Sequence, residues 1–132
     1  MTWIDPSGDS SVQSSDTARL GVRRLGHAVI VTATGDLGPA DERPWCDLVL
    51  AACISTISVR LVVVDLSGVT DISAVCGAAL TRANKICAEH GRELRVLATG
   101  SALTALRRDG LDRLVTVAGD IHRALLSSAI HH

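Results

Sequence analysis

Reactive side chains of three kinds lie close together between Ser67 and Gly77. This stretch carries the carboxylate of Asp71, the hydroxyl of Ser73 and the thiol of Cys76. A serine hydroxyl can accept a phosphate, which adds about −1.5 to −2 charge at neutral pH. A thiol in the first turn of a helix can become a reactive thiolate. These residue types therefore point to regulation by modification as the chemistry to consider here.

The elements on either side of this stretch predict how its groups are held. The run from Leu61 to Val64 is short, β-branched and without a polar face, which indicates a strand buried on both sides. Asp65 is expected to begin a loop, and Ser73 to cap a helix that begins at Ala74. Because sites tend to form beyond the carboxyl ends of strands, this turn is the leading functional candidate.

Two stretches of the sequence carry a family resemblance. The segment LVVVDLSGVTDISAVCGAAL, from Leu61 to Leu80, resembles the central signature of the STAS domain of bacterial anti-sigma-factor antagonists. The run GSALTALRRDGLDRLVTVAGDIHRAL further on is similar to the closing section of the same family, and the resemblance covers roughly Arg19 to Leu126. It implies a STAS-like α/β domain with a mixed sheet in the order β-β-α-β-α-β-α-β-α.

The resemblance also implies a function. Relatives of this type bind an anti-sigma factor, which is a protein kinase, and so release a sigma factor. The alternative that the resemblance permits is a soluble STAS subunit of a lipid or anion transport complex. A binding module rather than an enzyme is expected in either case, with no catalytic residues.

The sequence departs from the family pattern at the turn itself. The family's acidic residue and phosphoacceptor serine correspond here to Ser73 and Ala74, and the next two positions are Val75 and Cys76. Alanine has no hydroxyl, so the usual phosphorylation switch is expected to be missing, and Ser73 is expected to cap the helix. Asp71 has two explanations that stay open: a favourable charge near a helix N-terminus, or a permanent substitute for part of the phosphate charge.

The resemblance places a second contact in the loop Gly35–Asp41, which aligns with G-E-L-D of many relatives and keeps an acidic group at Asp36. A plain solvated turn is the alternative there. Cys76 is either a redox sensor or a buried structural thiol. The predicted partner-binding residues are Asp36, Asp71, Ser73, Ala74, Val75, Cys76 and Gly77.

The remaining chain is expected to hold a flexible tail at residues 1–17 and one domain at residues 18–130. Glycine, proline and capping residues predict the other boundaries. They give a hairpin turn at Gly26–His27, a loop at Gly35–Ala40, helices at Asp41–Thr56 and Ala74–His90, a strand at Glu93–Ala98, a helix capped by Ser101 and ending at Arg108, a strand at Leu114–Val117, and a last helix capped by Asp120.

Composition excludes several classes of function. With 132 residues, 47% of them apolar, and a net charge of −1, the chain has no basic footprint for nucleic acid. No apolar run reaches the roughly 20 residues that span a bilayer, so a cytoplasmic protein without membrane insertion is expected. The four cysteines predict no metal site, and none of the pairs within one helix can bridge. A bond between helices and a homodimer stay open, and no cofactor is expected.

Overall fold

Five strands form one mixed sheet in the computed structural model, which describes residues 18–54 and 59–130 and omits the side chains of residues 126–130. The predicted tail at residues 1–17 and the predicted helix end at Thr56 lie outside the described residues. The strand order is β1-β2-β3-β4-β5, with β1 antiparallel to β2 and the other neighbours parallel. The strands are β1 Arg19–Leu25, β2 Ala28–Leu37, β3 Leu61–Ile72, β4 Glu93–Leu97 and β5 Thr116–Ala118.

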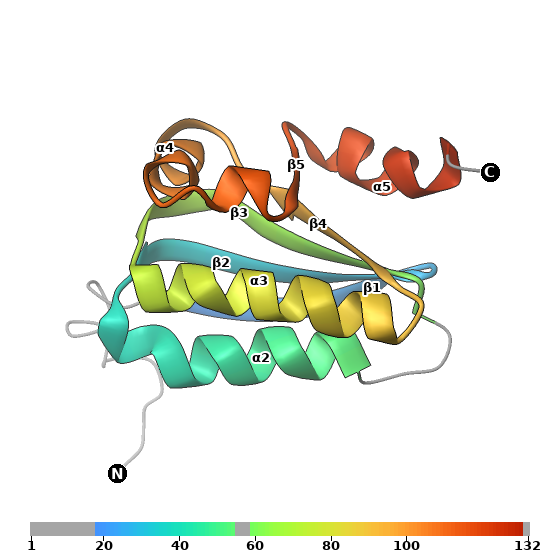
Figure 1. Ribbon diagram of the computed structural model, residues 1–132, viewed down its shortest axis with the longest axis horizontal. Coiled ribbons are helices and arrows are strands. Elements are labelled where there is room, and N and C mark those ends of the chain that lie inside the picture. The colour runs from blue at the N-terminus through green and yellow to red at the C-terminus, as the bar shows by residue number, and fades with distance from the viewer. Residues whose placement is uncertain (1–17, 55–58, 131–132) are drawn as a thin grey trace, which may run out of the picture.

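Four α-helices alternate with the strands in the described chain and confirm the predicted element order. They are α2 Glu42–Ile54, α3 Ala74–Glu89, α4 Gly100–Arg108 and α5 Ile121–Ile130, with 3-10 turns η1 at Pro39–Asp41 and η2 at Leu111–Arg113. Figure 1 shows α2 and α3 side by side against one face of the sheet, and α5 on the opposite face. Because β4 ends at Leu97, α4 packs against the part of β3 that β4 leaves unpaired.

The sheet separates two aliphatic clusters. Residues of alternate positions along β2 and β3 face the larger cluster under α2 and α3, including Val31 and Val64, which are fully buried. The intervening positions, including Ile30 and Val63, face the smaller cluster under α5. Side chains that alternate in this way between two covered faces explain the near-continuous apolar runs of these two strands.

The prediction that a loop begins at Asp65 was wrong. β3 continues for seven more residues to Ile72 and stays paired with β2 through two register shifts. Val69 and Ile72 are buried in this second half, so the strand gains apolar burial where the sequence reads as polar. Asp65 turns its carboxylate to the backbone and hydroxyl of Ser67, at 2.9 and 2.6 Å.

Other boundaries also moved. β2 runs through the predicted Gly35–Ala40 loop as far as Leu37, since Gly35 (φ +91°) absorbs a register shift. The prediction that Ser101 caps a helix was wrong, because the N-cap of α4 is Thr99, two residues earlier, and its side chain makes no capping bond. The strand expected at Leu114–Val117 lies instead at Thr116–Ala118, after η2.

A buried tryptophan ties α2 to the beginning of α3. The side chain of Trp45 is fully buried, and its indole Nε1 donates a hydrogen bond of 2.9 Å to the carbonyl oxygen of Cys76. An indole N–H inside a core needs such a partner, since leaving it unpaired would cost free energy. This contact fixes the first turn of α3, where the candidate site lies, relative to α2.

Replacing Trp45 by phenylalanine tests this anchor. Trp45→Phe removes one buried hydrogen bond and leaves a void, so we expect the free energy of unfolding to fall by about 2 kcal/mol. Urea unfolding followed by circular dichroism measures the change. The control is Leu25→Ala at a side chain that is 53% exposed, for which a change within about 0.5 kcal/mol is expected. Equal effects of the two substitutions would contradict the anchoring role.

Candidate functional site

The candidate turn lies where β2 and β3 end together. Asp36 and Asp71 are register partners in neighbouring parallel strands, as are Leu37 and Ile72. The backbone N–H of Ser73 then donates a 2.8 Å hydrogen bond to the carbonyl of Leu37, which carries the pairing one residue beyond the strand. The fold thus brings together the two segments that the sequence placed in one binding surface.

Ser73 caps α3 as predicted. Its backbone is extended, and its Oγ accepts a hydrogen bond of 3.3 Å from the N–H of Cys76. Its carbonyl oxygen accepts a second hydrogen bond, of 2.8 Å, from the N–H of Gly77. These bonds satisfy donors that the first turn of a helix leaves unpaired. The Ser73 hydroxyl is therefore directed to the backbone of the helix.

The seven predicted binding residues divide into an accessible and an inaccessible group. Asp36, Asp71, Ala74 and Val75 are exposed, and the exposed fraction of Val75 is 41%. Ser73 is half-buried. Cys76 and Gly77 are buried, so they support the surface from below and cannot themselves contact a partner.

Cys76 is a structural thiol in this arrangement. Its side chain is fully buried and its Sγ donates to the carbonyl of Gly38 at 3.4 Å. Burial raises the pKa of the Cys76 thiol above its usual value, and the hydrogen bond with Ser73 offsets only part of that rise. Of the two explanations that the sequence left open, the geometry supports the buried thiol, because a protonated, inaccessible sulfur is a poor nucleophile.

Gly77 allows a close approach between α3 and η2. A Cβ atom at this position would lie 2.4 Å from Cδ1 of Leu111. The amide Nδ2 of Asn84 also donates 3.3 Å to the carbonyl of Leu114. The side chain of Leu114 is 53% exposed, and the sequence analysis did not single it out because it assigned this residue to a strand.

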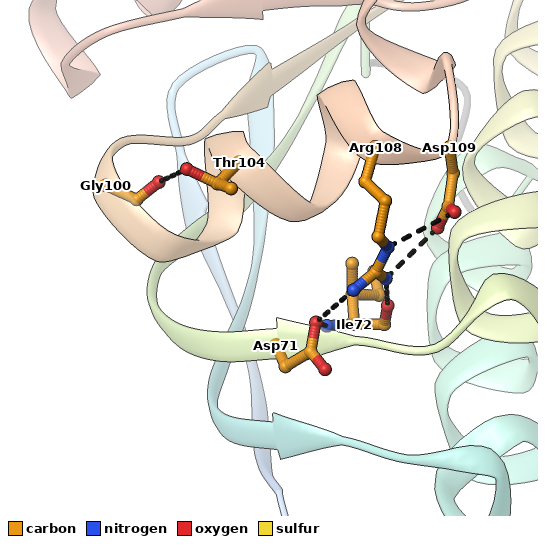
Figure 2. A network of polar contacts seen from close by, with 6 residues as sticks. All are labelled: Asp71, Ile72, Gly100, Thr104, Arg108 and Asp109. Carbon is orange, nitrogen blue, oxygen red and sulfur yellow. Dashed lines mark hydrogen bonds and ion pairs between the residues drawn. The ribbon is translucent and has the colours of Figure 1, made fainter.

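Arg108 holds the end of β3 against the end of α4 (Figure 2). Its NH1 lies 3.2 Å from Oδ1 of Asp71, and its NH2 donates a hydrogen bond of 2.9 Å to the carbonyl of Ile72. The same guanidinium contacts Asp109, whose hydrogen bond and charge are the main causes that raise the pKa of Arg108, with Asp71 adding to them. Oδ1 of Asp71 also accepts a hydrogen bond of 2.9 Å from the backbone N–H of Ile72.

This network bears on the two explanations of Asp71. The Asp71 carboxylate accepts from the Arg108 guanidinium and from the N–H of Ile72, and it is half-exposed, so solvent screens its charge. The geometry therefore favours a positioning role for Asp71 over that of a permanent phosphate substitute.

A shallow hollow of about 440 Å³ lies between β3 and α4. Its lining residues are Thr70, Asp71, Ser101, Thr104, Ala105 and Arg108. The hydroxyl of Thr104 donates a hydrogen bond of 3.1 Å to the carbonyl of Gly100. Each of the three guanidinium nitrogens of Arg108 donates a hydrogen bond to a protein oxygen. The side chains of Thr104 and Arg108 are thus already bonded to other groups of the protein.

Two further findings concern the residues that the structure describes. Among residues 18–54 and 59–130, no group of three or more His, Cys, Asp or Glu side chains is placed to hold a metal ion. In the same part of the chain, no helix has both the length and the apolar character needed to cross a membrane.

Comparison with known proteins supports the architecture. The family model described as "Mlab, STAS domain" matches residues 20–119. The chain belongs to the STAS domain family. This confirms the resemblance and the fold class expected from the sequence.

Among relatives of this STAS domain, the anti-sigma-F factor antagonist RsfA of Mycobacterium tuberculosis is 25% identical over 100 residues, covering 76% of this chain and 78% of RsfA. An anti-sigma factor antagonist from Mycobacterium paratuberculosis is similar in structure, with a TM-score of 0.68 and 21% identity over 89% of this chain and 97% of that chain.

Two more solved structures share the fold. SpoIIAA in its unphosphorylated form matches with a TM-score of 0.68 and 9% identity, covering 84% of this chain and 96% of that chain. The murine anion transporter Slc26a9 matches with a TM-score of 0.67 and 18% identity, covering 81% of this chain and 18% of the transporter.

The capping role of Ser73 can be tested directly. Ser73→Ala removes the oxygen that accepts from the Cys76 N–H, so the free energy of unfolding is expected to fall by about 1 kcal/mol. Ser73→Asn restores an acceptor and should recover most of the loss. Chemical denaturation of the three proteins measures this, and an alanine variant as stable as the parent would show that the cap contributes nothing.

Proposed function

We propose that this STAS domain is an anti-sigma-factor antagonist, a cytoplasmic, non-enzymatic protein that binds an anti-sigma factor and thereby frees a sigma factor. The observation that carries the proposal is the exposure of Val75 on the fixed first turn of α3. Burying an apolar side chain that protrudes from the first turn of a helix removes apolar surface from water, which favours association with another protein. The names of the relatives that match in sequence and in structure support the same assignment.

The proposed docking surface consists of Asp36, Asp71, Ala74 and Val75. It is preorganised, because strand pairing, the Ser73 cap and the Arg108 contacts hold its backbone before any partner arrives. A surface that is already ordered loses less conformational entropy on binding. The exposed carboxylate of Asp36 would favour a partner with a basic group facing it.

Control by serine phosphorylation is absent in this proposal, even with a kinase-type partner. Ala74 stands at the position of the family's phosphoacceptor and has no hydroxyl. The neighbouring Ser73 Oγ is half-buried and bonded to the helix backbone. Phosphorylating it would require the cap to open, which opposes transfer from a bound nucleotide.

A second function is supported by one specific likeness. The Slc26a9 match suggests that the same fold can form the STAS part of a transport protein, and this chain would then be a soluble subunit of such a complex. Co-purification with membrane components from the native cell would favour this function. Saturable binding to an anti-sigma factor without membrane would favour the first.

Calorimetric titration with the purified anti-sigma factors of the source organism tests the docking surface. Ala74→Arg places a long cation on it, and we expect the affinity to fall at least tenfold, which corresponds to about 1.4 kcal/mol. The matched control is Ala88→Arg, an exposed position near the other end of the same helix, which should bind like the parent. Equal binding by both variants would place the interface elsewhere.

Incubation with a kinase-type anti-sigma factor and ATP tests the phosphorylation argument. The parent protein should gain no phosphate by mass spectrometry, whereas Ala74→Ser should become a substrate because it restores a hydroxyl at the exposed position. Phosphate on Ser73 of the parent protein would contradict the claim that binding is free of this control.

A further inference from the structure

The four cysteines lie between α2 and α3, which are side by side in Figure 1. They form two pairs, here called rungs: Cys46 with Cys76 is the first rung, and Cys53 with Cys87 is the second. All four are free and buried. Trp45 contacts Cys76 near the beginnings of both helices, so the two helices run in the same direction. This alignment places Cys46 near Cys76 at one end of the pair and Cys53 near Cys87 at the other.

In the second rung, the side chain of Cys53 reaches α3 close to Cys87. The side chains of Cys53 and Cys87 are close enough to shift each other's pKa, that of Cys53 upward and that of Cys87 downward. The Sγ of Cys53 also lies 3.7 Å from the carbonyl oxygen of Ala83, one turn before Cys87. The side chain of Cys53 therefore reaches across the interface to the backbone of α3. Cys87 follows Ala83 by one helical turn, so the two cysteines face the same part of the interface between α2 and α3.

Arg92 connects both members of this rung. Its backbone N–H donates 2.8 Å to the carbonyl of Cys87, and its guanidinium NH1 donates to the carbonyl of Cys53. The hydrogen bond from Cys53 lowers the pKa of the Cys87 thiol, and Arg92 lowers it further, against the opposing effect of burial. The pKa of Cys53 is raised by its interaction with the Cys87 side chain and by burial. Cys87 is thus the nucleophile of the pair.

We propose that Cys53 and Cys87 form a reversible dithiol–disulfide pair that responds to hydroperoxides. The Cys87 thiolate attacks a peroxide oxygen: the S–O bond forms, the O–O bond breaks, and the departing hydroxide takes a proton to become water. The sulfur of Cys53 then attacks the sulfenic acid of Cys87, so that the S–S bond forms and the S–O bond breaks. The proton of Cys53 leaves with the second hydroxide as water. The two thiols lose two electrons and the peroxide gains them.

Access to the pair comes from the ends of the helices. Cys53 is the penultimate residue of α2, and Cys87 lies in the last turn of α3. Both sulfurs are fully buried in the folded state. Helix ends fray locally at much lower cost than the core, which admits a small oxidant such as hydrogen peroxide. Closure then returns the sulfurs to contact and protects the intermediate from further oxidation.

The first rung lacks these features. The pKa of the Cys76 thiol is raised, mainly by burial, whereas the pKa of the Cys87 thiol is lowered. No guanidinium is among the causes that shift the pKa of Cys76. Cys46 and Cys76 are therefore expected to stay reduced when Cys53 and Cys87 are oxidised, and they serve as internal controls.

The test treats the full-length protein with hydrogen peroxide, blocks the remaining thiols and maps peptides without reduction. We expect a loss of two hydrogens in mass, a peptide that links Cys53 to Cys87, free Cys46 and Cys76, and reversal by dithiothreitol. Cys53→Ala and Cys87→Ala should each abolish the link, whereas Cys46→Ala should keep it. Arg92→Lys should slow its formation several-fold if the guanidinium stabilises the thiolate.

The parent protein alone keeps the test decisive, because its peptide map does not depend on how any variant folds. Four thiols that all remain free under peroxide, while the protein stays folded by circular dichroism, would overturn the proposal. So would a link that joins other cysteines or two molecules. None of these outcomes depends on the identity of the binding partner, so the proposed function can fail while this inference stands, or the reverse.

Discussion

Parallel pairing between β2 and β3 is the interaction on which the rest of the structure depends. It begins at Ala28 opposite Leu61 and continues to Leu37 opposite Ile72, far beyond the point at which β4 leaves the sheet. This long ladder carries two carboxylates and the start of α3 to one edge. Where this pairing ends determines three features of the site. They are the helix cap formed by Ser73, the exposure of Val75 and the position of the groups that bind Arg108.

Local chemistry was enough to predict the parts of the site that depend on neighbours in sequence. The Ser73 cap and the beginning of α3 at Ala74 both follow from a short capping residue ahead of a helical pattern, and the structure has them at those positions. The hairpin at Gly26 and the Asp120 cap, whose carboxylate accepts from the N–H of Arg123, are predictable for the same reason. The element order came from the family signature as well as from periodicity.

Contacts between distant segments were beyond such reasoning. The second half of β3 reads as a polar turn, and only its pairing with β2, some thirty-five positions away, makes it a strand. The bond between Asp71 and Arg108 spans 37 positions, and nothing in the local pattern of α4 distinguishes Arg108 from its neighbour Arg107. Cys53 and Cys87 likewise meet only because two helices pack in one particular register.

The missing side chain at Gly77 has a consequence for how this family can vary. Since the side chain of Leu111 occupies the space that a Cβ at position 77 would need, α3 and η2 pack closely at this point. A relative with a bulkier residue at the position of Gly77 would need a smaller residue at 111, another rotamer of Leu111 or an outward shift of η2. Substitutions at these two positions should consequently change together across related sequences, and their joint pattern would record how tightly each relative holds this corner.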